Sequence, residues 1–360
     1  MASHFRTLTV KDIRRETPDC VSISFTVPEE LKEEFQFNHG QNISLKMKID
    51  GEEIRRSYSI CSSPLDDELR VAVKKIDNGR FSHYANSKLR KGMLLDLLPP
   101  TGKFYTELNP VNQKNYIAFG AGSGITPIFS IIKTTLTLEP KSQFTLFYGN
   151  RNRQSIIFKE QLEALKNRFM DRFSIHYIFS REKTDSPVNE GRINAGKCKE
   201  LSQHLFNPKN ADEVFICGPE EMISSVKDWL EQEGLEKRKI HFELFSAPGE
   251  KRLNVLGPQP TGLSEEKTSK VTIKSDGISF DFDLAYNGQS ILDAALKQGA
   301  DLPFACKSGV CCSCRAKLIE GKVKMDVNYA LEPEELEAGF ILACQSHPLT
   351  ENLMIDFDGK

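Results

Sequence analysis

The sequence lacks the long apolar runs, the charge excess and the signal segment that would assign it to several large classes of protein. No apolar run among its 360 residues approaches the length of a membrane-spanning helix. Residues 1–7 contain no apolar core segment, so we expect no secretory signal. The formal net charge is −2, which gives no indication of a nucleic-acid-binding surface. We therefore expect a cytoplasmic globular protein without a membrane or nucleic-acid partner.

A disulfide framework is also lacking, although cysteine itself is present. The nine cysteines are an odd number, and four of them are scattered: Cys20, Cys61, Cys198 and Cys217. This pattern suits a reducing cytoplasm. The other five lie near the C-terminus, at Cys306, Cys311, Cys312, Cys314 and Cys344.

The spacing of the C-terminal cysteines is C-x4-C-x2-C followed by a distant fourth cysteine, which is typical of plant-type [2Fe–2S] proteins. We expect four of them to bind the two irons: Cys306, Cys311, Cys314 and Cys344. Cys312 is left over, because four thiolates complete both irons. The alternative is a zinc site or a reduced, buried group of thiols. Zinc sites usually contain two C-x2-C pairs, and this chain has one.

A chain of this length suits two or three domains. Residues 1–108 alternate short strand patterns with turn signals, which predicts a small antiparallel barrel. Residues 109–246 alternate strands with helices, which predicts a doubly wound parallel sheet. Residues 247–269 are rich in proline and glycine and are interpreted as a linker. Residues 270–360 form the domain that carries the cysteines.

The last segment is predicted to begin with a hairpin that turns at Asp276-Gly277. A helix is expected at 291–297, and a strand at 340–344 is expected to carry Cys344. The segment contains 14 acidic and 9 basic side chains, so its charge is −5. This charge fits either an acidic carrier that is steered to a basic partner or an ordinary solvated surface.

Two motifs in the predicted barrel suggest a flat, phosphate-bearing ligand. In Arg56-Ser-Tyr58-Ser59, an arginine can hold a phosphate, an aromatic ring can stack on a ring system, and a hydroxyl can reach a ring nitrogen. Gly79-Arg-Phe81-Ser82 precedes a predicted short helix, and free N–H groups at a helix start bind phosphate. Each motif alone also fits an ordinary edge strand or turn.

Two further motifs lie in the predicted parallel sheet. Gly120-Ala-Gly122-Ser-Gly124-Ile-Thr126-Pro127 follows a strand and opens a helix, as a dinucleotide loop does, but departs from G-x-G-x-x-G. Cys217-Gly218-Pro219 stands at the carboxyl end of a later strand, where ligands bind in such sheets. The alternatives are a structural glycine turn and a buried cysteine.

Taken together and in this order, the four motifs resemble those of the ferredoxin–NADP reductase superfamily over essentially the whole chain. They match its R-x-Y-[ST], G-x-x-S, G-x-G-x-x-P and C-G-P patterns at Arg56–Ser59, Gly79–Ser82, Gly122–Pro127 and Cys217–Pro219. With the fused plant-type ferredoxin, the chain resembles oxygenase reductases. Residues 311–321, 325–331 and 342–346 look most like the reductase subunits of phenylacetyl-CoA epoxidase, and steroid-hydroxylase reductases share much of them.

The resemblance implies a multidomain fold: an FAD-binding barrel, an α/β NAD(P)-binding domain and an α+β (β-grasp) ferredoxin domain. It implies hydride transfer to FAD and then single-electron transfer through the cluster to an oxygenase. Ser59, Cys217 and Glu243 are the implied catalytic residues. FAD is assigned to Arg56, Tyr58, Ser59, Gly79, Phe81, Ser82 and Phe245. The nicotinamide nucleotide is assigned to Gly122, Gly124, Thr126, Pro127, Cys217, Gly218 and Pro219.

The ends of the second and third predicted parallel strands indicate which nucleotide is used. Arg151 follows one strand, and Ser180 and Arg181 follow the other. Arginine suits a 2′-phosphate, whereas an NAD site usually places a carboxylate on the ribose. The alternative is that these are solvated loop residues. We expect NADPH rather than NADH.

The partner implied by the resemblance is a di-iron epoxidase complex, with a reductase that is monomeric when free. One alternative is the reductase of a Rieske-type or steroid hydroxylase. A second is a non-enzymatic electron carrier or redox sensor, which requires no flavin. A third is electron flow in the reverse direction, from an external donor to NADP.

Overall fold

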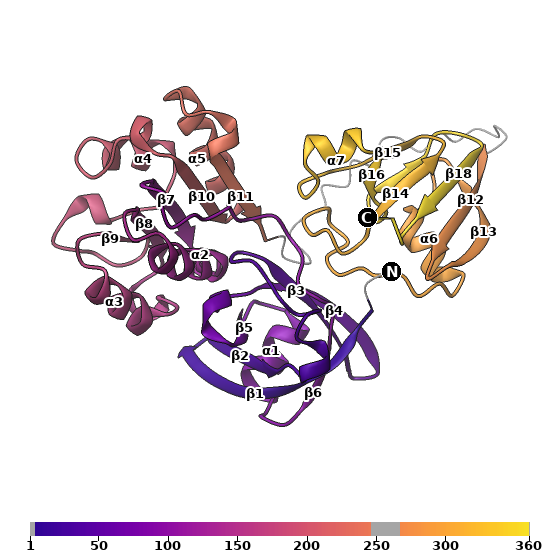
Figure 1. Ribbon diagram of the computed structural model, residues 1–360, viewed down its shortest axis with the longest axis horizontal. Coiled ribbons are helices and arrows are strands. Elements are labelled where there is room, and N and C mark those ends of the chain that lie inside the picture. Colours follow the sequence, from indigo (N-terminus) through magenta and orange to yellow (C-terminus); the bar gives the residue numbers. More distant parts are fainter. Residues whose placement is uncertain (1–3, 246–266, 360) are drawn as a thin grey trace.

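The structure is a computed structural model that describes residues 4–245 and 267–359. It contains three domains, each built on its own sheet: a barrel domain, a central domain and a C-terminal domain (Figure 1). Most of the predicted 247–269 linker lies outside the described residues. Its last two residues belong to the first strand of the C-terminal domain, which begins at Thr268. None of the described helices is long and apolar enough to cross a membrane.

The barrel domain is a six-stranded antiparallel sheet in the order β4-β3-β6-β1-β2-β5. Its elements are β1 (Arg6–Thr17), β2 (Cys20–Thr26), β3 (Asn42–Ile49), β4 (Glu52–Ser59), β5 (Leu69–Lys74), α1 (Arg80–Ser87) and β6 (Leu94–Leu97). A bridge between Ile60 and Val71 joins the two ends of this order and closes the sheet on itself. Ile43 and Leu45 of β3 alternate with serine and asparagine, so one face of the β3–β4 ribbon fills the core and the other faces outward.

The central domain contains a five-stranded parallel sheet in the order β11-β10-β7-β8-β9. Its strands are β7 (Asn115–Ala121), β8 (Gln143–Asn150), β9 (Phe173–Phe179), β10 (Glu213–Gly218) and β11 (Ile240–Leu244). Its helices are α2 (Ile125–Leu138), α3 (Lys159–Arg168), α4 (Ala195–Ser202) and α5 (Glu220–Gln232). The strand order reverses between β7 and β10, and ligands bind at the carboxyl ends of strands at such a point.

The C-terminal domain contains a five-stranded sheet in the order β13-β12-β18-β14-β16 and a two-stranded sheet. Its strands are β12 (Thr268–Ser275), β13 (Ile278–Ala285), β14 (Arg315–Glu320), β15 (Val323–Met325), β16 (Phe340–Leu342), β17 (Ser346–Pro348) and β18 (Asn352–Asp356). Its helices are α6 (Ile291–Lys297) and α7 (Pro333–Glu337). The apolar side of α6, including Ile291 and Leu292, is buried in the domain's core.

Three details differ from or sharpen the sequence-based expectations. The predicted hairpin turn is present, with positive φ angles of 55° at Asp276 and 74° at Gly277. The strand expected at 340–344 ends at Leu342, so Cys344 lies in the turn between β16 and β17. Helix α4 was not predicted, because only Cys198 and Leu201 of its eight residues are buried.

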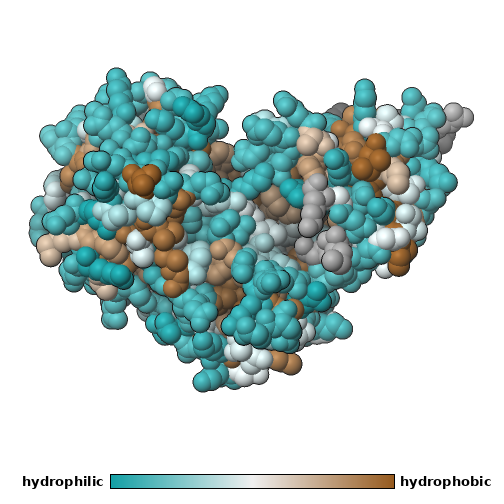
Figure 2. All heavy atoms as spheres, in the orientation of Figure 1, coloured by the Kyte–Doolittle hydropathy of each residue, from teal (hydrophilic) through white to brown (hydrophobic). Residues whose placement is uncertain are grey.

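The three domains are in direct contact. The barrel and central domains share apolar core, since Cys61 and Phe104 pack in the same cluster as Ile128. The C-terminal domain contacts the barrel through hydrogen bonds from Arg55 and Ser44. In space-filling view, the central and C-terminal lobes are separated by a notch at the top, and both rest on the barrel below (Figure 2).

Candidate functional site

The two motifs of the barrel domain come together in the structure. The rings of Tyr58 on β4 and Phe81 on α1 lie 5.7 Å apart between centroids. The hydroxyl of Ser82 donates to the Gly79 carbonyl at 2.9 Å, and a β-carbon on Gly79 would lie 2.4 Å from that hydroxyl oxygen. Gly79 therefore lets the turn between Ile76 and Ser82 close tightly at the start of α1.

Ser59 ends β4 and meets the central domain. Its hydroxyl donates to Oε2 of Glu243 at 2.8 Å, and the Asn42 side-chain amide lies 3.5 Å from Oε1. Burial raises the pKa of Glu243 to about 7, although both hydrogen bonds act in the opposite direction. The carboxyl can therefore hold or release a proton near neutral pH. Asn42 was missed from sequence, although it directly faces Ser59 in the β3–β4 register.

Glu243 also lies beside the C-G-P motif. Cys217 pairs with Glu243 on one side and with Gly120 on the other. The carboxyl ends of β7, β10 and β11 therefore lie side by side at these residues. Cys217 is fully buried, and burial raises the pKa of its thiol well above the usual value, with a further contribution from Glu243. The group is therefore a neutral thiol at neutral pH and not a thiolate nucleophile.

Gly124 of the glycine loop and Gly218 of the C-G-P motif have no room for a side chain. A β-carbon on Gly124 would lie 2.1 Å from the carbonyl oxygen of Cys217, and one on Gly218 would lie 2.7 Å from the Met222 methyl. Gly122 has a φ of 55°, which favours glycine. Thr126 donates to the Ser123 carbonyl at 2.9 Å, and Pro127 stands in the first turn of α2. The loop thus presents bare backbone at the switch point of the sheet.

The cysteine thiols of the C-terminal domain form two pairs. The Sγ atoms of Cys306 and Cys311 lie 3.2 Å apart, and the thiols of Cys314 and Cys344 are close enough to shift each other's pKa. A hydrogen bond from Cys311 lowers the pKa of Cys306 to about 5, and one from Cys314 lowers that of Cys344. Two pairs suit a cluster in which each iron takes two thiolates, whereas a zinc ion needs four ligands around one point.

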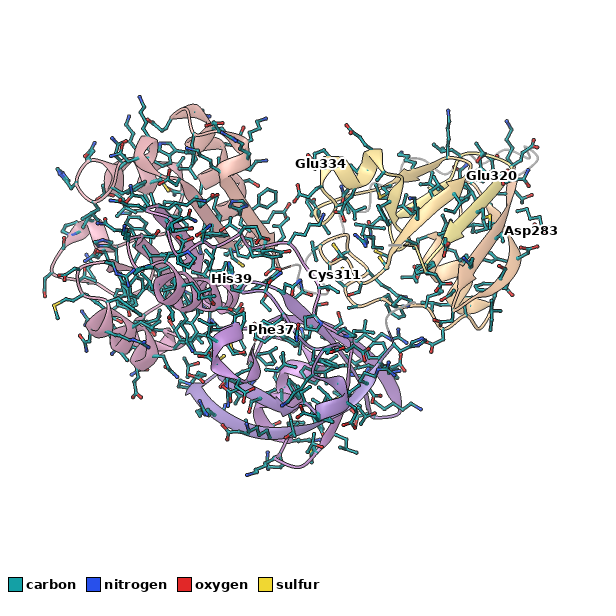
Figure 3. All side chains as sticks on the ribbon, in the orientation of Figure 1. Phe37, His39, Asp283, Cys311, Glu320 and Glu334 are labelled. Atoms are coloured by element: carbon teal, nitrogen blue, oxygen red, sulfur yellow. The ribbon has the colours of Figure 1, made fainter. Side chains whose placement is uncertain are left out.

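The loop around these thiols also supplies N–H donors. The amide of Ser308 points at Cys306 Sγ at 3.4 Å, and the side-chain amide of Gln345 points at Cys344 Sγ at 3.5 Å. Such donors adjust the potential of a bound cluster. Cys312 points elsewhere, because its Sγ donates to the Ala330 carbonyl at 3.4 Å. Cys311 lies on the side of the domain that faces the other two domains (Figure 3).

Comparison with known proteins gives three domain matches along the chain. Residues 7–105 match the oxidoreductase FAD-binding domain, residues 119–228 the oxidoreductase NAD-binding domain, and residues 273–349 the 2Fe-2S iron-sulfur cluster binding domain. The chain is 46% identical to a subunit of the 1,2-phenylacetyl-CoA epoxidase of Escherichia coli K12, with 99% of this chain and 98% of that protein covered.

The chain belongs to the ferredoxin–NADP reductase superfamily, with a fused plant-type ferredoxin. The reductase is also 33% identical to the ferredoxin reductase component of 3-ketosteroid-9-alpha-monooxygenase of Rhodococcus rhodochrous, over 97% of this chain and 96% of that protein. Among solved structures, phthalate dioxygenase reductase shares its fold, with a TM-score of 0.57, 23% identity and 98% of both chains covered.

These matches confirm the predicted fold class and the predicted FAD, [2Fe–2S] cluster and pyridine nucleotide as cofactors of the reductase. They also confirm that it is a flavin and iron–sulfur oxidoreductase. They do not distinguish NADPH from NADH, and the individual site residues stay predictions.

The strand ends of the reductase bring the proposed nucleotide-selecting residues side by side. The amide of Ser180 donates to the Asn150 carbonyl at 2.9 Å, and the amide of Arg181 donates to the Arg151 carbonyl at 2.9 Å. All three candidates (Arg151, Ser180 and Arg181) are exposed. The nearby Glu182 forms a 3.0 Å ion pair with Arg153. This carboxylate is therefore neutralised by its own neighbour.

One further residue at these strand ends was missed from sequence. Asn150 ends β8, its side chain is only 7% exposed, and neither of its amide atoms has a hydrogen-bond partner among the described residues. Buried amides normally have partners, so this one is an unsatisfied polar group beside the proposed nucleotide-selecting residues. A sequence signal did exist, since Asn150 directly precedes Arg151 at a strand end.

Proposed function

We propose that this reductase takes electrons from NADPH and passes them through FAD and the [2Fe–2S] cluster to an oxygenase, which we identify as a di-iron phenylacetyl-CoA epoxidase complex. The observation that carries the proposal is the position of the β3–β4 ribbon. Ser59 at its end contacts the central domain, and Ser44, one step further along the same face, contacts Ser313 in the cysteine loop (residues 306–314). The three predicted cofactor sites therefore meet at one ribbon.

The side chains of the reductase have distinct proposed roles around this ribbon. The flavin, when bound, takes two electrons from the nicotinamide and releases them singly to the cluster. We assign its pyrophosphate to Arg56 and to the α1 start at Gly79, Phe81 and Ser82. Tyr58 would flank its ring, and Ser59 would bond the ring nitrogen. Glu243 holds the proton that Ser59 relays, and Phe245 closes the site from the end of the central domain.

The nicotinamide end is assigned to the central domain. Gly122, Gly124 and Pro127 leave the backbone open to the nucleotide, with Thr126 and Cys217 beside its ring and Gly218-Pro219 shaping the corner. Arg151, Ser180 and Arg181 bind the 2′-phosphate. The four cysteines of the two thiol pairs ligate the irons: Cys306, Cys311, Cys314 and Cys344.

The identity of the partner rests on the relatives of the chain. Nearly full-length identity of 46% to one component of an epoxidase favours phenylacetyl-CoA epoxidase over the steroid monooxygenase suggested by the 33% relative. We further propose that the protein is cytoplasmic and monomeric when free. None of the nine cysteines, all of which lie in the described residues, forms a disulfide, and this suits a reducing compartment.

A reconstitution experiment tests the partner. The holoprotein is mixed with NADPH, phenylacetyl-CoA and the oxygenase components of the Escherichia coli epoxidase, and epoxide formation is followed. The matched arm uses the oxygenase of the 3-ketosteroid monooxygenase with its steroid substrate. We expect faster turnover in the first arm. Equal or faster steroid turnover would contradict the proposed partner and favour the steroid-hydroxylase alternative.

A further inference from the structure

The outward face of the β3–β4 ribbon is a ladder of three side-chain pairs that reach different parts of the protein. The register pairs Asn42 with Ser59, Ser44 with Ser57, and Lys46 with Arg55. The first pair contacts Glu243 of the central domain. Ser44 and Arg55 of the other two pairs contact the C-terminal domain. Nζ of Lys46 lies 4.3 Å from the centroid of the Phe5 ring in the N-terminal segment.

Arg55 makes the most extensive of these contacts. Its side chain is only 8% exposed, and its guanidinium carbon lies 4.1 Å from the centroid of the Phe304 ring. Its Nη1 donates to the Leu302 carbonyl at 3.1 Å, and its Nε donates to Glu53 at 2.7 Å. Phe304 stands two residues before Cys306, so Arg55 holds the start of the cysteine loop. A buried guanidinium that stacks and donates at once is a specific contact.

The serine pair reaches the loop itself. The hydroxyl oxygens of Ser44 and Ser57 lie 2.9 Å apart, and those of Ser44 and Ser313 lie 2.8 Å apart. Ser313 lies between Cys312 and Cys314, directly before a proposed cluster ligand. The hydroxyls of Ser57, Ser44 and Ser313 thus form a continuous row from the ribbon to the cysteine loop.

A third contact lies at the edge of the same interface. Nζ of Lys103 in the barrel domain lies 3.1 Å from Oε2 of Glu335, whose side chain is 8% exposed. Arg315, just after Cys314, binds the other oxygen of Glu335 at 2.6 Å. The carboxylate thus joins a barrel cation to the end of the cysteine loop.

The spacing of the pairs along the ribbon also sets the distance between the contact with the cysteine loop and the proposed flavin site. Neighbouring pairs on the same face of a strand are two residues apart, which is about 7 Å. The Ser44–Ser57 pair that touches the cysteine loop is therefore one step from Ser59, where the flavin ring nitrogen is assigned. Electron transfer slows steeply with distance. Docking of the cysteine loop at the Ser44–Ser57 pair would therefore bring the flavin, as electron donor, close to the cluster, as electron acceptor.

We propose that Arg55 and Ser44, with Lys103 at the edge, form the seat on which the C-terminal domain docks to receive electrons from the flavin within the same chain. The inference rests on the proposed function and deepens it. Arg55 and Ser44 act as positioning residues: they hold the cysteine loop against the ribbon and hold neither cofactor.

The test uses the full-length holoprotein and two variants, Arg55→Ala and Ser44→Ala. The matched controls are Arg238→Ala, which removes an exposed arginine paired with Glu236, and Ser24→Ala, which removes a buried barrel hydroxyl without a partner among the described residues. Hydrogen exchange of 301–305 and small-angle scattering report docking directly. Electron paramagnetic resonance reports the cluster, and stopped-flow absorbance separates flavin reduction by NADPH from cluster reduction.

We expect unchanged flavin content, cluster spectrum and flavin reduction in both variants. Exchange at 301–305 should be faster and the scattering radius larger, and cluster reduction should be slower by about tenfold in Arg55→Ala, because losing one charged hydrogen bond shifts a docking equilibrium by that factor. Ser44→Ala should show the same changes to a smaller degree, and the controls should match wild type.

Three results would overturn the inference. One is wild-type exchange and cluster reduction in both variants. The second is a slowing of cluster reduction in Arg238→Ala or Ser24→Ala equal to that in the Arg55→Ala or Ser44→Ala variant. The third is loss of FAD from Arg55→Ala with normal docking in Ser44→Ala, which would make Arg55 a cofactor ligand. Failure of the proposed function is distinct, because the wild type itself would then lack FAD or a cluster.

Discussion

The Ser59 hydroxyl and the Glu243 carboxylate, 184 residues apart in the chain, meet at 2.8 Å and join the barrel domain to the last strand of the central domain. The contact places a titratable group beside the neutral thiol of Cys217. Because Glu243 has a pKa of about 7, its protonation changes within the working range of pH.

The pH dependence of stability should show the contribution of Glu243. Its pKa rises on folding from the ordinary 4.5 to about 7, so the folded protein binds more protons than the unfolded chain between these values. Its stabilising contribution is thus complete below pH 4.5 and is lost as pH rises through about 7. The loss is about 3 kcal/mol. Denaturant unfolding of Glu243→Gln across this range should show a flatter profile, whereas Glu236→Gln, at an exposed site, should follow wild type.

Cluster ligation should distinguish the adjacent cysteines. Cys312→Ser should keep the [2Fe–2S] absorbance and paramagnetic spectrum, because the Cys312 thiol points to the Ala330 carbonyl and not into either thiol pair. Cys311→Ser should lose the cluster, since it breaks the pair with Cys306. Loss of the cluster in Cys312→Ser together with its retention in Cys311→Ser would show that the assignment is reversed.

Gly124 should not tolerate a methyl group. Gly124→Ala places a β-carbon 2.1 Å from the Cys217 carbonyl oxygen, so the loop or the end of β10 must shift. We expect a loss of about 1–3 kcal/mol in the free energy of unfolding and weaker nucleotide binding. Gly196→Ala in α4 is the matched control, because its new β-carbon meets only an ordinary 3.4 Å contact. That variant should be slightly stabilised, and equal effects in both would refute the clash.

The choice of nucleotide should depend on Arg181. Arg181→Ala should raise KM for NADPH by about 10- to 100-fold, the usual effect of losing a charged hydrogen bond to phosphate, and leave KM for NADH nearly unchanged. Arg238→Ala, at the amino end of the parallel strands, should change neither. Steady-state kinetics with NADPH and with NADH as electron donor measure the two KM values. An equal effect on both donors, or a wild type that prefers NADH, would contradict the assignment.

The domains should be separable. A chain that ends near residue 246 contains the whole barrel and central domain with their shared apolar core. It should bind FAD and reduce artificial acceptors with NADPH but fail to deliver electrons to an oxygenase. Absence of FAD from this fragment would show that the domain boundary or the barrel assignment is wrong.

Features encoded in short stretches of sequence were predictable. The cysteine spacing, the glycine loop and the alternation of strands and helices are local patterns, and the domain matches confirm the fold that they indicated. Helix α4 is local too, but its only clear signal is Asn194, whose side chain accepts from the amide of Lys197 at the helix start. Its short apolar face gave little periodicity.

Residues whose roles depend on distant partners could not be predicted. Asn42 contacts Glu243 across 201 residues, and Arg55 contacts Leu302 across 247. Neither residue has a motif of its own. The position of Cys344 also escaped prediction, because the amide of Gln345 bonds back to Leu342 and turns the chain where an apolar run suggested a continuing strand.

The hydrogen bond between Ser44 and Ser313 spans 269 residues, and that separation has a consequence for protein synthesis. At about 5–20 residues per second, a ribosome that has just made Ser44 reaches Ser313 about 13–54 s later. The barrel has its own apolar core and can fold in that interval, with its seat for the C-terminal domain still open to water. A seat made of a serine, a lysine and an arginine can remain hydrated during this time, whereas an exposed apolar surface would favour aggregation of the nascent chain.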